Sequence, residues 1–213
     1  MADSDKDILI TPQTGASSDP TIQFKSGATS GDPITLSVID DGTTTSLDFS
    51  GSAGQLFSIS NDLTGTIFGV ADGSGIPVIE ADADGTVRLA EFGGSVEFGA
   101  PIKEAIATSS GTSAAIDLSS GSIFWHTAGA GTTTVTLSNG PASNQSQTIT
   151  LIHQQDATGN RAITWPTTNF YWAENIEPPV STGANDLDVY TIQIINNGGT
   201  TYYFASLSVK NAS

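Results

Sequence analysis

The apolar residues of this chain recur at the spacing of β-strands, and this periodicity limits the fold more than any other feature of the sequence. In an amphipathic helix apolar residues return at positions i, i+3, i+4 and i+7, whereas in a half-buried strand they alternate with polar ones. Gly, Pro or runs of Ser and Thr interrupt every helical pattern, and the best helical candidate, 101–108, is short. Alternating segments such as 34–38 occur throughout, so the sequence predicts an all-β fold.

The composition agrees with a folded β protein. Hydrophobic residues make up 37% of the chain and charged residues 13%, which fits neither a disordered polyelectrolyte nor a membrane protein. Ser and Thr are far more frequent than in ordinary proteins, and 23 glycines accompany them. Hydroxyl side chains suit the solvent face of strands and glycine suits turns, so this bias supports the same fold class.

The strong negative charge limits the partners that the chain can bind. The formal charge at pH 7 is −16, and the 6 Lys and Arg residues are scattered singly along the sequence. A protein needs clustered basic side chains to release counterions from a phosphate backbone, so we expect no nucleic-acid binding. A surface of one sign also keeps copies soluble before they assemble.

Several other features bear on stability and location. The chain has no cysteine, which excludes a disulfide framework and thiolate chemistry. Residues 1–7 are polar and the apolar segment 8–10 is too short for a signal peptide, so we expect no cleaved leader. No segment is long and apolar enough for a transmembrane helix, and we expect no membrane insertion. If the protein works outside a cell, we expect it to be released by lysis.

Residues 1–30 are predicted to form an N-terminal attachment arm. Two short apolar segments, separated by turn residues, have too little apolar surface to fold alone, so we expect them to pair with a neighbouring chain or a docking surface. The candidate attachment residues are Ile8, Leu9, Ile10, Ile22 and Phe24.

Residues 31–106 are predicted to form a domain of short β-strands. Apolar and polar residues alternate in segments about ten residues apart, and Gly-containing turns such as 82–85 separate them. Such short strands bury little apolar area within one chain. We therefore expect several copies to share a core, most simply as an intertwined homotrimer.

The C-terminal half is predicted to be a more conventional domain. Residues 107–113 have the Ser, Thr and Gly composition of a linker, and 114–213 contain about seven strand segments. All three Trp and all four Tyr residues fall in this half, so the larger core is expected here. The expected fold is a β-sandwich or jelly-roll-like domain.

The acidic and histidine motifs favour structural roles. The segment 82–85 begins like a calcium loop, but its glycine comes too early and Gly93 stands where a bidentate carboxylate is needed, so a hairpin turn is the better interpretation. His126 and His153 are the only histidines, and zinc would need two more ligands, so both are expected to be buried in sheets. We predict no cofactor and no metal.

Catalytic patterns are weak. Glu174 and Glu177 could form the carboxylate pair of a glycosidase, but two acids three positions apart in a loop are more often a solvated surface. The chain lacks a Gly-x-Ser-x-Gly nucleophile elbow, and a Ser-His-Asp triad has no local support. The sequence therefore predicts a protein that is not an enzyme.

Three consecutive aromatic residues, Phe170, Tyr171 and Trp172, lie in the longest irregular segment of the sequence. Aromatic residues on a loop anchor protein interfaces and stack on sugar rings. The alternative is that they fold back onto the sandwich or are buried between subunits, and we favour burial. They are candidate interface or receptor residues, with a host surface glycan as the possible ligand.

Segments in both halves resemble recurring parts of virion structural and tail-fibre-like proteins of marine tailed bacteriophages, including cyanophages. The matching segments are 31–36, 49–60, 63–68, 75–80 and 87–94 in the first half, and 116–121, 151–161, 163–166 and 196–204 in the second. The resemblance implies a non-enzymatic particle component and carries no catalytic residues.

The expected function is a trimeric tail fibre or short spike, attached to other virion proteins by its N-terminal arm. Because the chain is short for a fibre, a capsid decoration (cement) protein bound to the major capsid protein is an alternative. A carbohydrate-binding module for host adhesion is a second alternative.

Overall fold

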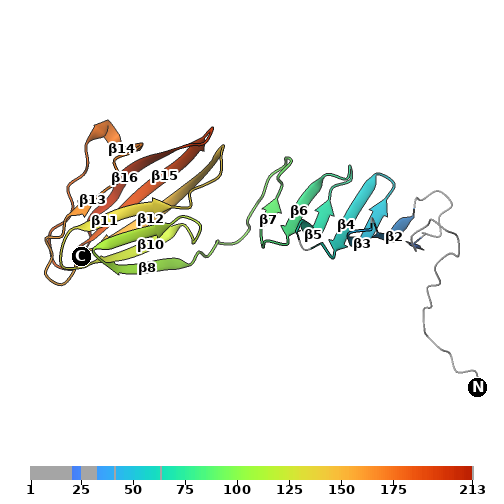
Figure 1. Cartoon of the computed structure of the whole chain (residues 1–213), viewed down its shortest axis with the longest axis horizontal. Coiled ribbons are helices and arrows are strands. Elements are labelled where there is room, and N and C mark those ends of the chain that lie inside the picture. Colours follow the sequence, from blue (N-terminus) through green and yellow to red (C-terminus); the bar gives the residue numbers. More distant parts are fainter. Residues whose placement is uncertain (1–20, 25–32, 41, 63, 213) are drawn as a thin grey trace, which may run out of the picture. The chain divides into compact units, whose positions relative to one another are not determined.

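The computed structural model describes residues 21–24, 33–40, 42–62 and 64–212 and confirms the all-β fold (Figure 1). The chain divides into two compact units, Met1–Gly99 and Ala100–Ser213. The only helical element in the described part of the chain is the short 3₁₀ turn η1 (Ala173–Asn175). Each unit is described separately below.

The first unit contains one antiparallel sheet of seven strands, whose order in the sheet is their order in the sequence. Its strands are β1 (Thr21–Phe24), β2 (Ile34–Asp40), β3 (Thr45–Gly51), β4 (Gly54–Ser60), β5 (Thr66–Ala71), β6 (Pro77–Asp82) and β7 (Val87–Leu89). The predicted hairpin at 82–85 is present: the amide of Asp82 donates to the carbonyl of Thr86 at 2.8 Å. Gly85 adopts a φ of 88° there, which a side chain would disfavour.

The second unit contains two sheets. The larger sheet has the order β14-β16-β15-β12-β10-β8 and the smaller β13-β11-β9. The strands are β8 (Ile106–Gly111), β9 (Ser113–Asp117), β10 (Ile123–Ala128), β11 (Thr133–Ser138), β12 (Gln145–Gln154), β13 (Ile163–Thr164), β14 (Phe170–Trp172), β15 (Leu187–Asn197) and β16 (Thr200–Ala212).

From β8 to β13 the chain alternates between the two sheets of the second unit. Consecutive strands here do not pair with each other, and the neighbours within each sheet run parallel: β10 with β8 and β12, and β11 with β9 and β13. Only after β14 does the chain form an ordinary antiparallel hairpin, β15–β16, beside β12. The two-layer sandwich was predicted, but this winding path was not.

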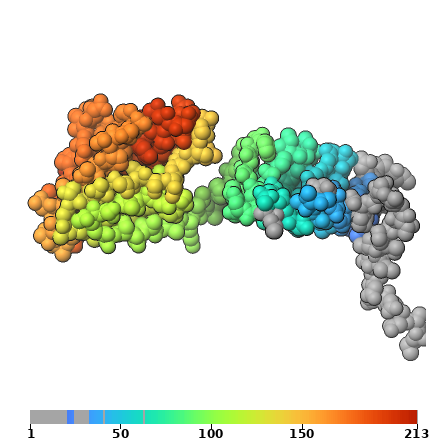
Figure 2. Space-filling model, in the orientation of Figure 1, coloured from blue at the N-terminus to red at the C-terminus, as the bar shows by residue number. Residues whose placement is uncertain are grey.

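A single hydrophobic core fills the space between these two sheets. Figure 2 shows residues 106–154, in green and yellow, lying directly against the later residues of the same unit, in orange and red. Tyr190, Ile192 and Ile194 of β15 are fully buried. The ring of Trp165 lies 4.8 Å from that of Tyr190 and 5.1 Å from that of Trp172, measured between centroids. The prediction that the larger core lies in this half of the chain agrees with this burial.

The predicted linker 107–113 lies mostly within strands β8 and β9, and the units divide at Gly99 and Ala100 instead. The Ser and Thr residues of this segment resemble a linker in composition, but hydroxyl side chains also suit an edge strand. Gly129 has a structural role beside this segment, because a Cβ atom on it would lie 2.9 Å from the Cα atom of Gly111. The helical candidate 101–108 is likewise wrong, since β8 begins at Ile106.

Candidate assembly surface

One face of the seven-stranded sheet is apolar along its whole width. Alternate residues of a strand point to the same face, and directly paired residues of neighbouring strands lie side by side. The register therefore builds two continuous apolar rows, which we call the apolar strip. The first row is Ile22, Leu36, Phe49, Phe57, Val70, Ile79 and Leu89, and the second is Val38, Leu47, Ile59, Phe68, Ala81 and Val87.

The opposite face of this sheet is mainly polar. Its central row passes through small and charged residues in the order Ser37, Asp48, Ser58, Gly69, Glu80 and Arg88. Arg88 forms ion pairs with Asp82 and with Glu91. In a sheet with one apolar and one polar face, the apolar face usually packs against another layer and the polar face is exposed to water.

None of the described residues of the first unit covers the apolar strip. None of the described residues of the first unit is buried, and Leu47, Ile59 and Leu89 are 38%, 48% and 44% exposed. Edge-to-face contacts at 5.5 Å and 5.3 Å join Phe49 to Phe57 and Phe57 to Phe68, so the centre of the strip is a ladder of aromatic rings. A single sheet needs a second layer to exclude water from such a face.

The predicted attachment residues fall in two places. Ile22 and Phe24 belong to β1, the edge strand of the sheet, where Ile22 pairs with Leu36 and Phe24 with Ile34 on the apolar face. The second segment of the predicted arm is therefore part of the sheet. Ile8, Leu9 and Ile10 lie outside the described residues.

The predicted aromatic loop is an edge strand, β14, which pairs in parallel with β16. Phe170 and Trp172 point inward and pack against the core, with Trp165 at 5.6 Å and 5.1 Å from their rings. Tyr171 points outward and stacks on Phe204 at 5.7 Å. Successive side chains of a strand point to opposite faces, so Tyr171 faces outward while its two neighbours face inward. The sequence predicts a loop here and therefore does not reveal this difference.

His126 and His153 lie inside the sandwich, stacked at 6.0 Å between ring centroids, and each is 1% exposed. His126 Nε2 donates to the carbonyl of Gly111 at 3.0 Å, so Nδ1 accepts from the Ser109 hydroxyl at 2.9 Å. His153 lies 3.4 Å from the Thr133 hydroxyl, and its Nδ1 has no partner. Burial lowers the pKa of both imidazoles, and that of His153 falls to about 4, with a contribution from the neighbouring His126.

The acidic residues singled out in the sequence lie apart from one another in the described part of the chain. Glu174 and Glu177 are both exposed, and only Glu177 lines a hollow, of about 340 Å³, beside Arg161. Buried Asp188 accepts hydrogen bonds from the amide and hydroxyl of Ser181, at 2.7 Å and 2.6 Å. Among the described residues no group of three or more His, Asp or Glu side chains is placed to hold a metal ion.

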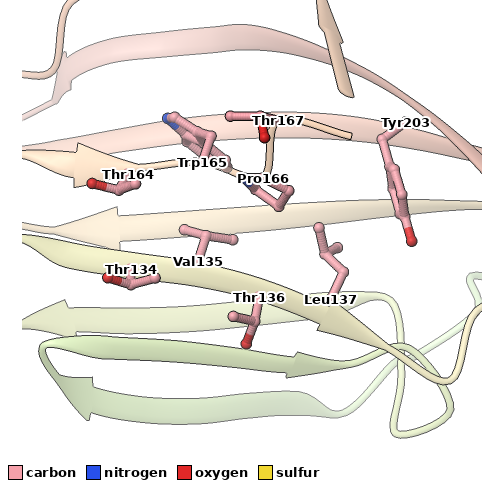
Figure 3. A pocket seen from close by; sticks show the side chains of 9 residues that line it. All are labelled: Thr134, Val135, Thr136, Leu137, Thr164, Trp165, Pro166, Thr167 and Tyr203. Carbon is pink, nitrogen blue, oxygen red and sulfur yellow. The ribbon is translucent and has the colours of Figure 1, made fainter. Parts of the chain in front are cut away.

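A groove of about 490 Å³ opens beside β11, where the short strand β13 ends (Figure 3). Val135 and Leu137 point from β11 toward Pro166, and Tyr203 closes the far end. The remaining lining residues are Thr134, Thr136, Thr164, Trp165 and Thr167. The lining contains no carboxylate and no imidazole, so the groove offers apolar contact and hydroxyl hydrogen bonds but no acid–base pair.

No protein-family model, no curated protein and no solved structure matches this chain. Within the described residues, no helix has the length and apolarity that a bilayer crossing requires.

Proposed function

We propose that this protein is a non-enzymatic structural component of a tailed bacteriophage particle, exposed at its surface as a trimeric tail fibre or short spike and attached through its N-terminal arm. The observation that supports self-assembly most directly is the apolar strip, which no described residue of the first unit covers. The resemblance of both halves to virion proteins supports the phage particle as the place of assembly.

The size of the strip is sufficient to hold copies together. Seven strands about 4.8 Å apart give the strip a length of roughly 30 Å, and two rows give it a width of about 10 Å. Covering the exposed half of its apolar side chains would contribute on the order of 10 kcal/mol per chain, before the entropic cost of association.

The shape of the strip favours three copies over two. Two narrow strips placed face to face leave both long sides of the contact open to water. Three strips around a common axis enclose one another, and their polar faces, with Glu80 and Arg88, then point outward. Closed rotational symmetry of this kind is the usual arrangement of identical subunits.

The second unit fits the part that a particle presents outward. It has its own buried core, and its stability does not depend on the apolar strip. A capsid decoration protein would use the same two parts, and copy number separates the two functions. A decoration protein occupies every equivalent site of the head lattice, whereas a fibre or spike is present in a few copies on the tail.

Sedimentation of the full chain tests the assembly step. Wild-type protein at micromolar concentration should have three times the chain mass of 21.8 kDa. Ile59→Asp places a charge in the strip and should give monomers, because the charge would lose its hydration in the contact. Ile39→Asp is the matched control, since Ile39 is 43% exposed on the opposite face, and it should remain trimeric.

A monomeric wild-type protein, or equal masses for the two variants, would reject assembly through the strip. Labelling the protein on purified particles and imaging them tests the place of assembly independently. Absence from the particle would reject the phage role even if the protein is a trimer in solution.

A further inference from the structure

The outward face of the six-stranded sheet in the second unit forms a second continuous surface, which we call the outer sheet face. Figure 1 shows the strands β14, β16, β15, β12, β10 and β8 in succession across this unit. Alternate residues of these strands point inward to the core, and the others form five rows on the outer face. The rows are Ser146, Ile195 and Tyr202; Thr148, Gln193, Phe204 and Tyr171; Ile106, Ile123, Thr150, Thr191 and Ser206; Thr108, Trp125, Ile152, Val189 and Val209; and Ser110, Thr127, Gln154, Leu187 and Ala212.

The outer sheet face carries no charge, although the chain has 22 acidic residues and a net charge of −16. More than half of its residues are aliphatic or aromatic. Large apolar side chains remain exposed on it, including Ile106 at 54% and Phe204 at 46%. Depletion of charge together with enrichment in aromatic residues is the composition of the centre of a protein–protein interface.

We infer that the outer sheet face is a contact surface for an identical copy of this chain. This inference assumes the self-assembly proposed above, but it concerns a different surface in a different unit. Two copies of this strongly negative chain repel each other, and the repulsion is smallest where the two contacting surfaces carry no charge. The outer sheet face meets this condition, so a second copy is the partner that its charge pattern favours.

The dimensions of the face agree with a protein partner. Six strands span roughly 25 Å, and five rows of alternate residues extend over about 27 Å along them. The resulting accessible area approaches the roughly 800 Å² that each partner contributes to a standard interface. Ile152 lies at the centre of the fully apolar part, between Trp125 and Val189.

A neutral glycan is the alternative ligand, and it would use only one end of this surface. The stacked pair Tyr171 and Phe204, with Gln193 beside it, could hold a sugar ring. It would leave the aliphatic rows around Ile152 uncovered. A glycan site would therefore account for the exposed aromatic pair but not for the uncharged aliphatic rows on the rest of the outer sheet face.

The test measures the concentration at which the full-length assembly dissociates, by sedimentation over a dilution series. Ile152→Glu should raise this concentration by at least about tenfold, because a charge in each copy would meet its counterpart across an apolar contact. Ile176→Glu is the matched control, since Ile176 is 65% exposed outside the sheets, and it should dissociate like the wild type. Near-ultraviolet circular dichroism of the tryptophans verifies the fold of each variant.

If Ile152→Glu fails to fold, Thr150→Glu places the same charge at a polar position of the neighbouring row. An assembly that dissociates at the wild-type concentration in a folded variant would overturn the inference and leave the contact through the apolar strip intact. Retention of the wild type on immobilised dextran, lost in Phe204→Ala while association is unchanged, would assign the face to a glycan instead. A wild-type chain that never associates would reject the proposed assembly itself.

Discussion

The buried histidine pair makes the stability of the second unit sensitive to mild acid, and the size of this effect follows from the structure. His153 is 1% exposed, its Nδ1 has no partner, and its pKa lies at about 4 instead of 6.5. A shift of this size, at about 1.4 kcal/mol for each pH unit, corresponds to about 3 kcal/mol. The folded protein therefore resists a protonation that the unfolded chain accepts.

The sign of the effect follows from proton linkage. Between pH 6.5 and pH 4 the unfolded chain binds more protons at this residue than the folded chain does, so stability falls as the pH is lowered. Above pH 6.5 neither state is protonated, and below pH 4 both are, so the dependence flattens on either side. The lowered pKa values of Asp117 and Asp156 act at lower pH, because these carboxyls ionise near or below 3.8.

Urea unfolding followed by tryptophan fluorescence reports on the stability of the second unit alone, because Trp125, Trp165 and Trp172 all lie in it. We expect the free energy of unfolding to fall by about 3 kcal/mol from pH 7 to pH 4, at constant ionic strength. His153→Gln, whose side chain does not titrate, should remove most of this dependence. The argument would be refuted by a flat profile in the wild type, or by an unchanged slope in the variant.

Three further predictions test packing and backbone geometry. Trp172→Ala should destabilise the second unit by about 3 kcal/mol, because the ring packs against the core, whereas Tyr171→Ala should cost less than about 1 kcal/mol; urea unfolding compares the two. Gly129→Ala should destabilise the same unit by about 1–3 kcal/mol, since its Cβ would lie 2.9 Å from Gly111. A variant as stable as the wild type would show that β8 can shift to make room for the added methyl group. Asp188→Asn should cost about 2 kcal/mol at neutral pH by weakening its bonds to Ser181, and a thermal midpoint equal to the wild type would contradict this role.

The sequence predicts individual strands better than the way they are connected. Alternation in segments such as 34–38 indicates both the strand and its apolar face, because the pleat fixes a period of two. The same pattern does not reveal which strands pair. The chain between β8 and β13 changes sheet at almost every turn, and no local signal in Ser113–Asp117 or Thr133–Ser138 distinguishes a parallel neighbour from an antiparallel one.

The candidate surfaces were only partly predictable for a related reason. The shortage of core in the first half is visible in its short strands, so the need for other copies could be inferred. The apolar strip itself depends on register, which brings Phe49, Phe57 and Phe68 from three strands into one ladder. The outer sheet face was missed because its residues come from six strands, and no segment of the sequence shows that they share a face without charge.

The two units differ in how their stability depends on concentration, and this difference separates folding from assembly. The second unit buries its own core, so it should remain folded when the protein is diluted. The sheet of the first unit has no buried residue among those described, so the protection of its amides should fall as copies separate. Hydrogen exchange at two protein concentrations tests this expectation: strands β3 to β5 should lose protection on dilution, while β12 and β15 keep it. Equal protection of β3 to β5 at both concentrations would mean that the sheet is stable without partners, and the argument for assembly through its apolar strip would fail.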